Sequence, residues 1–200
     1  MLNLFPNEKI ILPLPDAVFE YYPNFIDNET ADRLFEKILQ ETPWQQDDII
    51  LFGKKIPQPR LTALFGDQGL TYTYSKLTLN ANKWNTPLMF LKNEIENKTQ
   101  LQFNAALLNF YRNENDSNGW HADNEKELGL DPIVASLSLG ETRVFQLKHN
   151  TKTDIKKSID LKHGSLILMK EGSQLHYKHQ IPKSSKMKKP RINITFRSIQ

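Results

Sequence analysis

His121 and Asp123 are the residues of this 200-residue chain that most clearly suggest chemistry. If the segment around them is extended, side chains two residues apart project from the same face, so an imidazole and a carboxylate can bind one metal ion. A third ligand is available in the segment His176-Tyr177-Lys178-His179 near the C-terminus. Two histidines and one carboxylate on one face, with the other positions open, are the ligands of non-heme Fe(II) oxygenases.

The spacing leaves the third ligand open between His176 and His179. On a strand these two side chains face opposite ways, so only one of them can point at the metal. His149 and His163 lie near turns, and we expect both at the surface. A closed structural zinc site is not expected, because such sites normally use cysteine and four protein ligands, and the chain has no cysteine.

A strand with two arginines follows the histidines. Residues 191–197 alternate between an apolar face (Ile192, Ile194, Phe196) and a polar face (Arg191, Asn193, Thr195, Arg197). Two guanidiniums on one face suit a small dicarboxylate, since arginine pairs with carboxylates in a bidentate manner. The backbones of Arg191 and Arg197 would stand roughly 20 Å apart, so both side chains must lean toward each other over the ligand. Together with the metal ligands, this strand indicates an oxygenase that uses 2-oxoglutarate.

Two helices and at least seven strands are expected to position these residues. The helices are predicted over residues 27–41 and from Thr86 to about Lys98, and the strands over residues 103–111, 134–139, 143–148, 158–161, 164–169, 176–180 and 191–199. Residues 1–26 show no clear period and are predicted to form an extended arm packed on the domain. This order of elements favours a mainly β, α+β domain, a β-sandwich or jelly roll with the helices against one sheet.

Composition excludes several classes of protein. The absence of cysteine excludes a disulfide framework. No apolar run approaches the ~20 residues that a membrane span needs, and the N-terminus does not read as a signal peptide. The net charge of +3 is mild, but five basic residues crowd one short loop, namely Lys183, Lys186, Lys188, Lys189 and Arg191. Such runs are more often solvated surface than binding sites.

These motifs resemble the signature of the AlkB family of Fe(II)/2-oxoglutarate dioxygenases. The resemblance extends from about Phe52 to the C-terminus, and its further segments are Gly66-Asp67-x-Gly69-Leu70-Thr71-Tyr72-Thr73-Tyr74-Ser75, Asn109-x-Tyr111, His163-Gly164-Ser165-Leu166 and Pro190-Arg191. The flanking stretches are most similar to the branch that repairs alkylated bases in duplex DNA. The resemblance implies one domain over residues 1–200, with an arm and helix (1–45), a nucleotide-recognition lid (46–80) and a double-stranded β-helix, or jelly-roll, core (101–200).

The resemblance also implies the cofactors and the residues that hold them. Iron would be bound by His121, Asp123 and His179. The 2-oxoglutarate would be held by Arg197 with Asn109 near the iron and by Arg191 with Tyr111 at the distal carboxylate, with Asn193 supporting the pocket. The implied reaction uses O2 to convert 2-oxoglutarate to succinate and to hydroxylate an N-alkyl group on a damaged base. The hydroxylated group then leaves as an aldehyde, which is formaldehyde for a methyl group, and the base is restored.

A base in a duplex must be flipped out to reach a buried metal, at a cost of a few kcal/mol. We expect Tyr72, Tyr74 and His121 to sandwich the flipped base. Glu125 lies two residues after Asp123 and is predicted to accept a hydrogen bond from an exocyclic amino group.

The duplex itself is expected to contact the lid and the basic loop. Phe52 is predicted to fill the space that the flipped base leaves, as apolar wedges do elsewhere. Arg60 and Lys54 are predicted to contact phosphates nearby. Beside an active site, the loop over residues 183–189 also becomes a candidate phosphate contact, which would position DNA without reading its sequence.

The sequence is also compatible with other functions. The polymer could be RNA or single-stranded DNA, and a protein or small-molecule hydroxylase is a further alternative. A non-catalytic nucleic-acid-binding module is disfavoured because a binder does not need the full set of metal ligands and arginines. The expected enzyme is a monomer without a membrane partner, intracellular, and cytoplasmic or nuclear according to whether its source is bacterial or eukaryotic.

Overall fold

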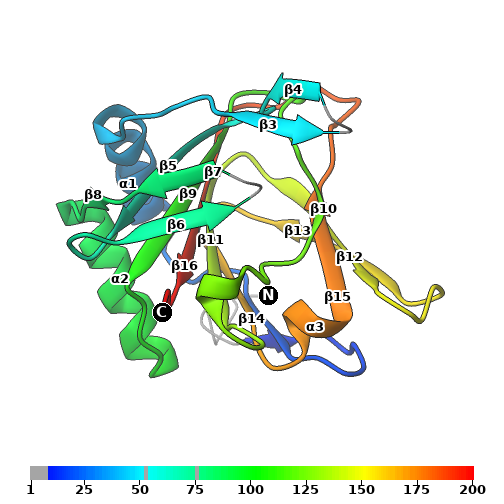
Figure 1. Cartoon of the computed structure of the whole chain (residues 1–200). Coiled ribbons are helices and arrows are strands. Elements are labelled where there is room, and N and C mark those ends of the chain that lie inside the picture. The colour runs from blue at the N-terminus through cyan, green and yellow to red at the C-terminus, as the bar shows by residue number, and fades with distance from the viewer. Residues whose placement is uncertain (1–8, 52–53, 75–76) are drawn as a thin grey trace.

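The computed structural model describes residues 9–51, 54–74 and 77–200, in which two sheets face each other (Figure 1). The larger sheet has the order β1 (Ile10–Ile11), β2 (Phe19–Tyr22), β14 (Ser165–Met169), β11 (Val134–Gly140), β16 (Arg191–Arg197), β9 (Ala105–Tyr111), β5 (Leu61–Gly66) and β8 (Asn82–Lys83). The smaller sheet has the order β10 (Asn118–His121), β15 (Tyr177–Ile181), β12 (Arg143–His149) and β13 (Lys156–Leu161). Two facing, mainly antiparallel sheets confirm the predicted jelly roll.

Two hairpins stand apart from both sheets. They are β3 (Asp48–Leu51) with β4 (Lys54–Pro57), and β6 (Thr71–Tyr74) with β7 (Leu77–Asn80). Both fall within the segment 46–80 that was predicted to form a lid. In Figure 1 the β3–β4 hairpin lies along the upper edge of the molecule, and the β6–β7 hairpin lies in front of β9 and β16.

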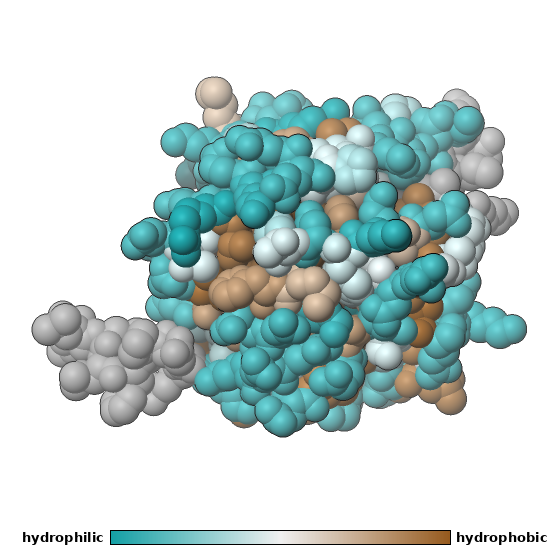
Figure 2. Space-filling model, turned by 90° about the vertical axis from the view of Figure 1, so that its left-hand side faces the viewer, coloured by the Kyte–Doolittle hydropathy of each residue, from teal (hydrophilic) through white to brown (hydrophobic). Residues whose placement is uncertain are grey.

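Two helices cover the outer face of the larger sheet. Asp27 caps α1 (Asn28–Glu41) by accepting a hydrogen bond from the Thr30 N–H, as its sequence predicts. Asn85 caps α2 (Thr86–Thr99) by accepting a hydrogen bond from the Leu88 N–H, and the helix begins at Thr86 as predicted. The face that carries these helices is mainly hydrophilic, with hydrophobic side chains in a band across its middle (Figure 2). No helix within the described ranges is long and apolar enough to cross a membrane.

Strand β16 shows how the core and the interior of the jelly roll are divided. All seven of its residues are buried. Ile192, Ile194 and Phe196 pack in the core cluster formed with α1 and α2, and full burial of each contributes about 1.5–3 kcal/mol. The four polar residues alternate with them and therefore face the space between the sheets. The predicted alternation is confirmed.

Three local expectations differ from the structure. The N-terminal arm contains β2, which pairs with β14 and so belongs to the larger sheet. The strand predicted from His176 begins at Tyr177, because residues 173–176 form the short helix α3 (Ser173–His176). His149 is buried rather than exposed, since it faces inward on β12 and its Nε2 lies 3.0 Å from Oδ2 of Asp16.

Candidate active site

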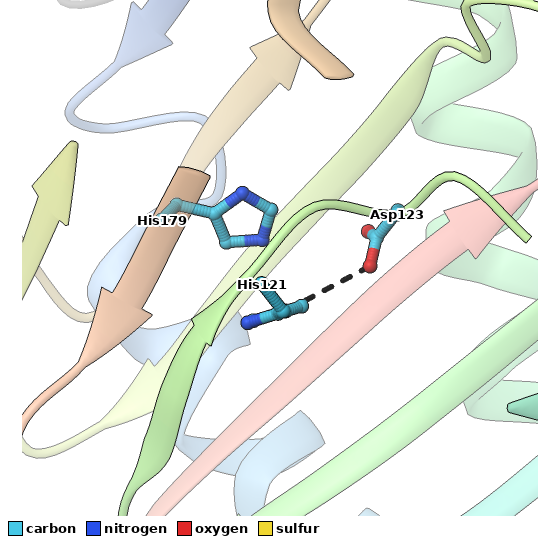
Figure 3. Close-up of side chains that lie close together, drawn as sticks. All are labelled: His121, Asp123 and His179. Carbon is cyan, nitrogen blue, oxygen red and sulfur yellow. Dashed lines mark ion pairs between the residues drawn. The ribbon is translucent and has the colours of Figure 1, made fainter. Parts of the chain in front are cut away.

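Three metal-binding side chains meet between the two sheets (Figure 3). His121 ends β10, Asp123 follows it, and His179 lies directly opposite His121 on β15. Their ligand atoms all lie within 4.8 Å of one another. His176 instead stacks on His149, with ring centroids 5.9 Å apart. The structure therefore selects His179 from the two candidates.

Both imidazoles are prepared for a metal ion. Nδ1 of His121 donates to the carbonyl oxygen of Gly119 at 2.7 Å, so Nε2 carries the lone pair. Nε2 accepts a hydrogen bond from Nδ2 of Asn118 at 3.2 Å, which a bound metal ion would replace. Burial lowers the pKa of His121. The pKa of His179 is lowered to about 3, first by burial and then by the nearby His121 ring. Neutral imidazoles are the form that binds metals. The His121 side chain is 33% exposed and that of Asp123 only 4%, so the site opens on the side of His121.

Asp123 is held as a carboxylate by its surroundings. Burial would raise its pKa, but Arg197 and the two imidazoles outweigh burial and hold the pKa well below its usual range. Nη2 of Arg197 lies 3.0 Å from Oδ2 of Asp123. The Asp123 backbone N–H donates to Oε1 of Gln174 on α3 at 2.9 Å, which fixes the chain just after β10.

The polar face of β16 forms one wall of the site with its neighbouring strands. On β9, Tyr111 lies opposite Arg191 and Asn109 lies opposite Asn193. On β11, Ser138 accepts a hydrogen bond from Nη2 of Arg191 at 2.8 Å. Three adjacent central strands thus set one row of polar side chains at fixed register.

These polar side chains line one side of a cavity of about 120 Å³. On the same measure a water molecule needs only ~10–15 Å³, so a small organic anion can be accommodated. Three guanidiniums and two carboxylates line it, those of Arg60, Arg191, Arg197, Asp123 and Glu125. The ring of Tyr111 lies 5.1 Å from the Arg191 guanidinium.

Both arginines of β16 present buried donors without acceptors. Within the part of the chain that the structure describes, Nε and Nη1 of Arg191 and of Arg197 have no hydrogen-bond partner. Leaving such donors unpaired costs about 1–3 kcal/mol each, and more for charged groups. Burial lowers the pKa of Arg191 to about 10. A dicarboxylate such as 2-oxoglutarate fits this donor set, because it supplies both acceptors and negative charge.

Arg60 lies in the wall of the same cavity. It is buried, and its Nε donates to Oδ1 of Asn109 at 2.7 Å while Nη1 donates to the carbonyl oxygen of Ser117 at 3.3 Å. The bond to Oδ1 leaves the Nδ2 amide of Asn109 as the group available to a ligand. Sequence indicated a phosphate contact for Arg60, and its role in substrate binding stays a prediction.

The remaining residues predicted to contact a base are only partly described. Tyr72 is buried, with the Arg197 guanidinium 5.4 Å from its ring centroid, and it interacts with Glu125. Burial raises the pKa of Glu125, and the nearby Asp123 carboxylate raises it further. Oε2 of Glu125 is buried without a hydrogen-bond partner among the described residues. Phe52 and the side chains of Lys54 and Tyr74 lie outside the described part of the structure.

Several residues of the site had not been identified from the sequence. Gln174 and Arg143 reach the site from distant segments, and Arg143 lies 5.5 Å from the Tyr111 ring centroid. Ser136 and Ser138 did carry a signal. Residues 135–139 read Ala-Ser-Leu-Ser-Leu, an alternation that predicts a hydroxyl-lined face on a strand.

Comparisons with known proteins agree with this geometry. The profile described as the 2OG-Fe(II) oxygenase superfamily matches residues 18–197. The human "alpha-ketoglutarate-dependent dioxygenase alkB homolog 3" is 41% identical over 187 residues, which are 89% of this chain and 65% of that protein. The mouse "DNA oxidative demethylase ALKBH2" is 34% identical over 179 residues, covering 84% of this chain and 75% of that protein.

A solved structure supports the fold. The structure of OsALKBH1 superposes with a TM-score of 0.67 at 16% identity and covers 94% of this chain and 100% of its own. The chain spans just under two thirds of the length of the alkB homolog 3 proteins that it matches.

Proposed function

Because the chain belongs to the AlkB family of 2OG-Fe(II) oxygenases, we propose that it removes alkyl groups from damaged nucleic-acid bases by oxidation. The observation that carries this proposal is the pairing of the triad His121, Asp123 and His179 with buried, unpaired guanidinium donors in the same cavity. When bound there, Fe(II), 2-oxoglutarate and O2 would supply the oxidation of an N-alkyl group, with succinate, CO2 and an aldehyde as products.

The chain's own residues would bind and orient the reactants. Arg191, stacked on Tyr111, would pair with the distal carboxylate of 2-oxoglutarate. Arg197 and the Nδ2 amide of Asn109 would hold the carboxylate nearer the metal, and Asn193, tied to Ser136 at 2.8 Å, would support the pocket. Burial of all these groups excludes water and strengthens their charge–charge contacts.

The substrate base would enter beside His121, on the open side of the triad. Tyr72, Tyr74 and His121 are proposed to enclose the base. The free Oε2 acceptor of Glu125 suits an exocyclic amino group, as found on 1-methyladenine or 3-methylcytosine. The resemblance to a protein named as a DNA demethylase favours DNA. Duplex DNA is the proposed form, with Phe52 as the wedge.

The test is release of succinate and formaldehyde from a 1-methyladenine oligonucleotide with Fe(II), 2-oxoglutarate and ascorbate. We expect both products with repair of the base, and at least a thousandfold loss of activity in Asp123→Ala, because one metal ligand is removed. The same assay on single-stranded DNA, duplex DNA and RNA identifies the polymer. Succinate without base repair on any polymer would contradict 1-methyladenine as the substrate, and absence of both products with bound metal would contradict the oxygenase itself.

A further inference from the structure

Three lysines form a row across the outer face of the four-stranded sheet. Lys178 on β15 lies directly opposite Lys148 on β12, and Lys148 lies directly opposite Lys156 on β13. Alternation places all three on the side away from the triad, since the inward positions of β12 and β15 are buried. Neighbouring strands are about 4.8 Å apart, so three ammonium groups share one short row.

The row continues to an exposed tryptophan beside the active site. Trp120 on β10 is 38% exposed, and Nζ of Lys148 lies 4.3 Å from its ring centroid. To make this contact, Lys148 extends over the intervening strand β15. Trp120 precedes the metal ligand His121, so the row begins at the edge strand that borders the open side of the site. In Figure 1 this sheet lies on the side of the molecule opposite α1 and α2.

The charges of the row are not neutralised by the protein. None of the ion pairs between described residues includes Lys148, Lys156 or Lys178. On the described strands of this sheet, the acidic residue on the same face is Asp160, which stands four residues along β13 from Lys156, roughly 13 Å away. The neighbouring cross-strand pair, Gln180 and Gln146, carries no charge, and Nε2 of Gln180 donates to Oε1 of Gln146 at 2.6 Å.

A purely structural role does not account for this arrangement. Like charges directly opposite each other destabilise a sheet. Lysines on edge strands prevent edge-to-edge aggregation, which can explain Lys156 on the edge strand β13. Lys148 and Lys178 lie on the two inner strands and need another explanation.

We propose that this face, formed by Trp120, Lys148, Lys156 and Lys178, binds the phosphodiester backbone of the nucleic-acid substrate beyond the nucleotide that enters the site. The inference rests on the proposed function, because only a polymeric substrate continues past the edge strand. A polymer leaving the open side at His121 crosses β10 and meets the row of lysines next. The contacts are to phosphate, so they strengthen binding without reading sequence.

The test is equilibrium binding of labelled, unmodified single-stranded oligonucleotides over a range of salt concentrations. Replacing Lys148, Lys156 and Lys178 by Gln should weaken binding of a 20-mer at least tenfold. The slope of log affinity against log salt should fall by about 2, because each lost phosphate contact on a single strand removes about 0.7. Binding of a 6-mer and turnover of a methylated trinucleotide should stay unchanged.

A matched control carries the same change in net charge on the helical face. Lys37→Gln, Lys83→Gln and Lys98→Gln remove three exposed lysines near α1, β8 and α2 and should leave the slope as in the wild type. If the wild type binds DNA and the variant of Lys148, Lys156 and Lys178 shows the same salt slope, the proposed phosphate-binding surface is wrong. The proposed function is not affected by that result. Failure of the wild type to bind any nucleic acid would overturn both. Loss of binding to polyglutamate with an unchanged DNA slope would assign the face to another polyanion.

Discussion

The two ends of β16 solve the same electrostatic problem in different ways. Arg197 and Arg191 are both buried, and Nη2 of each contacts a side-chain oxygen, of Asp123 and of Ser138 respectively. Arg197 contacts the carboxylate of Asp123, which outweighs burial and raises the pKa of the guanidinium. Arg191 has no carboxylate partner among the described residues; it contacts the hydroxyl of Ser138 and the side chain of Tyr111, and burial lowers its pKa. One end is neutralised by the protein, and the other end lacks an anion that a ligand can provide.

The largest effect is expected at the neutralised end. Arg197→Met should lower the free energy of unfolding of the metal-free protein by about 3–5 kcal/mol, because Asp123 is left as an unpaired buried charge. Urea unfolding in the presence of a chelator measures this. Arg33→Met, at an exposed position on α1, is the control and should change the value by less than about 0.5 kcal/mol. A variant as stable as the wild type would show that the pair contributes no net stability.

The opposite behaviour is expected at the other end. Arg191→Met should leave the metal-free protein as stable as the wild type or about 1 kcal/mol more stable, because an unpaired buried cation is replaced by an apolar side chain. The KM for 2-oxoglutarate should rise about 100-fold, as charge-assisted hydrogen bonds contribute about 1.5–3 kcal/mol each.

Thermal unfolding with Mn(II) in place of iron separates these two effects. 2-Oxoglutarate should raise the melting temperature of the wild type and leave that of Arg191→Met unchanged. Equal stabilisation of both proteins would contradict this assignment. The distal carboxylate of 2-oxoglutarate would then have to bind elsewhere, and the missing anion at Arg191 would not be the ligand.

The smallest effect is expected between the two ends, at Arg60. Arg60→Met should raise the KM for 2-oxoglutarate about fivefold, because Asn109 loses the guanidinium that orients it and its own hydrogen bond to the ligand is weakened by about 1 kcal/mol. The measurement is the KM with a saturating oligonucleotide, and Arg60→Lys should partly restore it. An unchanged KM with weaker oligonucleotide binding would instead support the phosphate contact that the sequence suggested for this residue.

The sequence predicted best where a local pattern and the tertiary structure agree. The alternation of residues 191–197 placed Ile194 and Arg191 on opposite faces of one strand, because a strand has a period of two. The two helices were located within one residue at each end, because their apolar residues recur at helical spacing. The jelly roll followed from the order of the elements.

Contacts between distant segments could not be read from local patterns. Spacing could not choose between His176 and His179, because only the tertiary structure shows that His179 lies opposite His121 and that His176 stacks on His149. Gln174 reaches Asp123 across 51 residues, and Arg60 reaches Asn109 across 49. Residues 19–22 carry no helical or alternating pattern, since a strand buried on both faces has no polar side to reveal it.

The double use of β16 has a consequence for how this sequence can vary. Its odd-numbered residues face the site and its even-numbered residues face the helices, so substitutions on one side can accumulate without disturbing the other. A deletion or insertion of one residue inside the strand would exchange the two faces of the residues beyond it. Guanidiniums would then lie in the hydrophobic core under the helices, and isoleucines would lie in the cavity. We therefore expect substitutions within this strand to be tolerated more often than insertions or deletions.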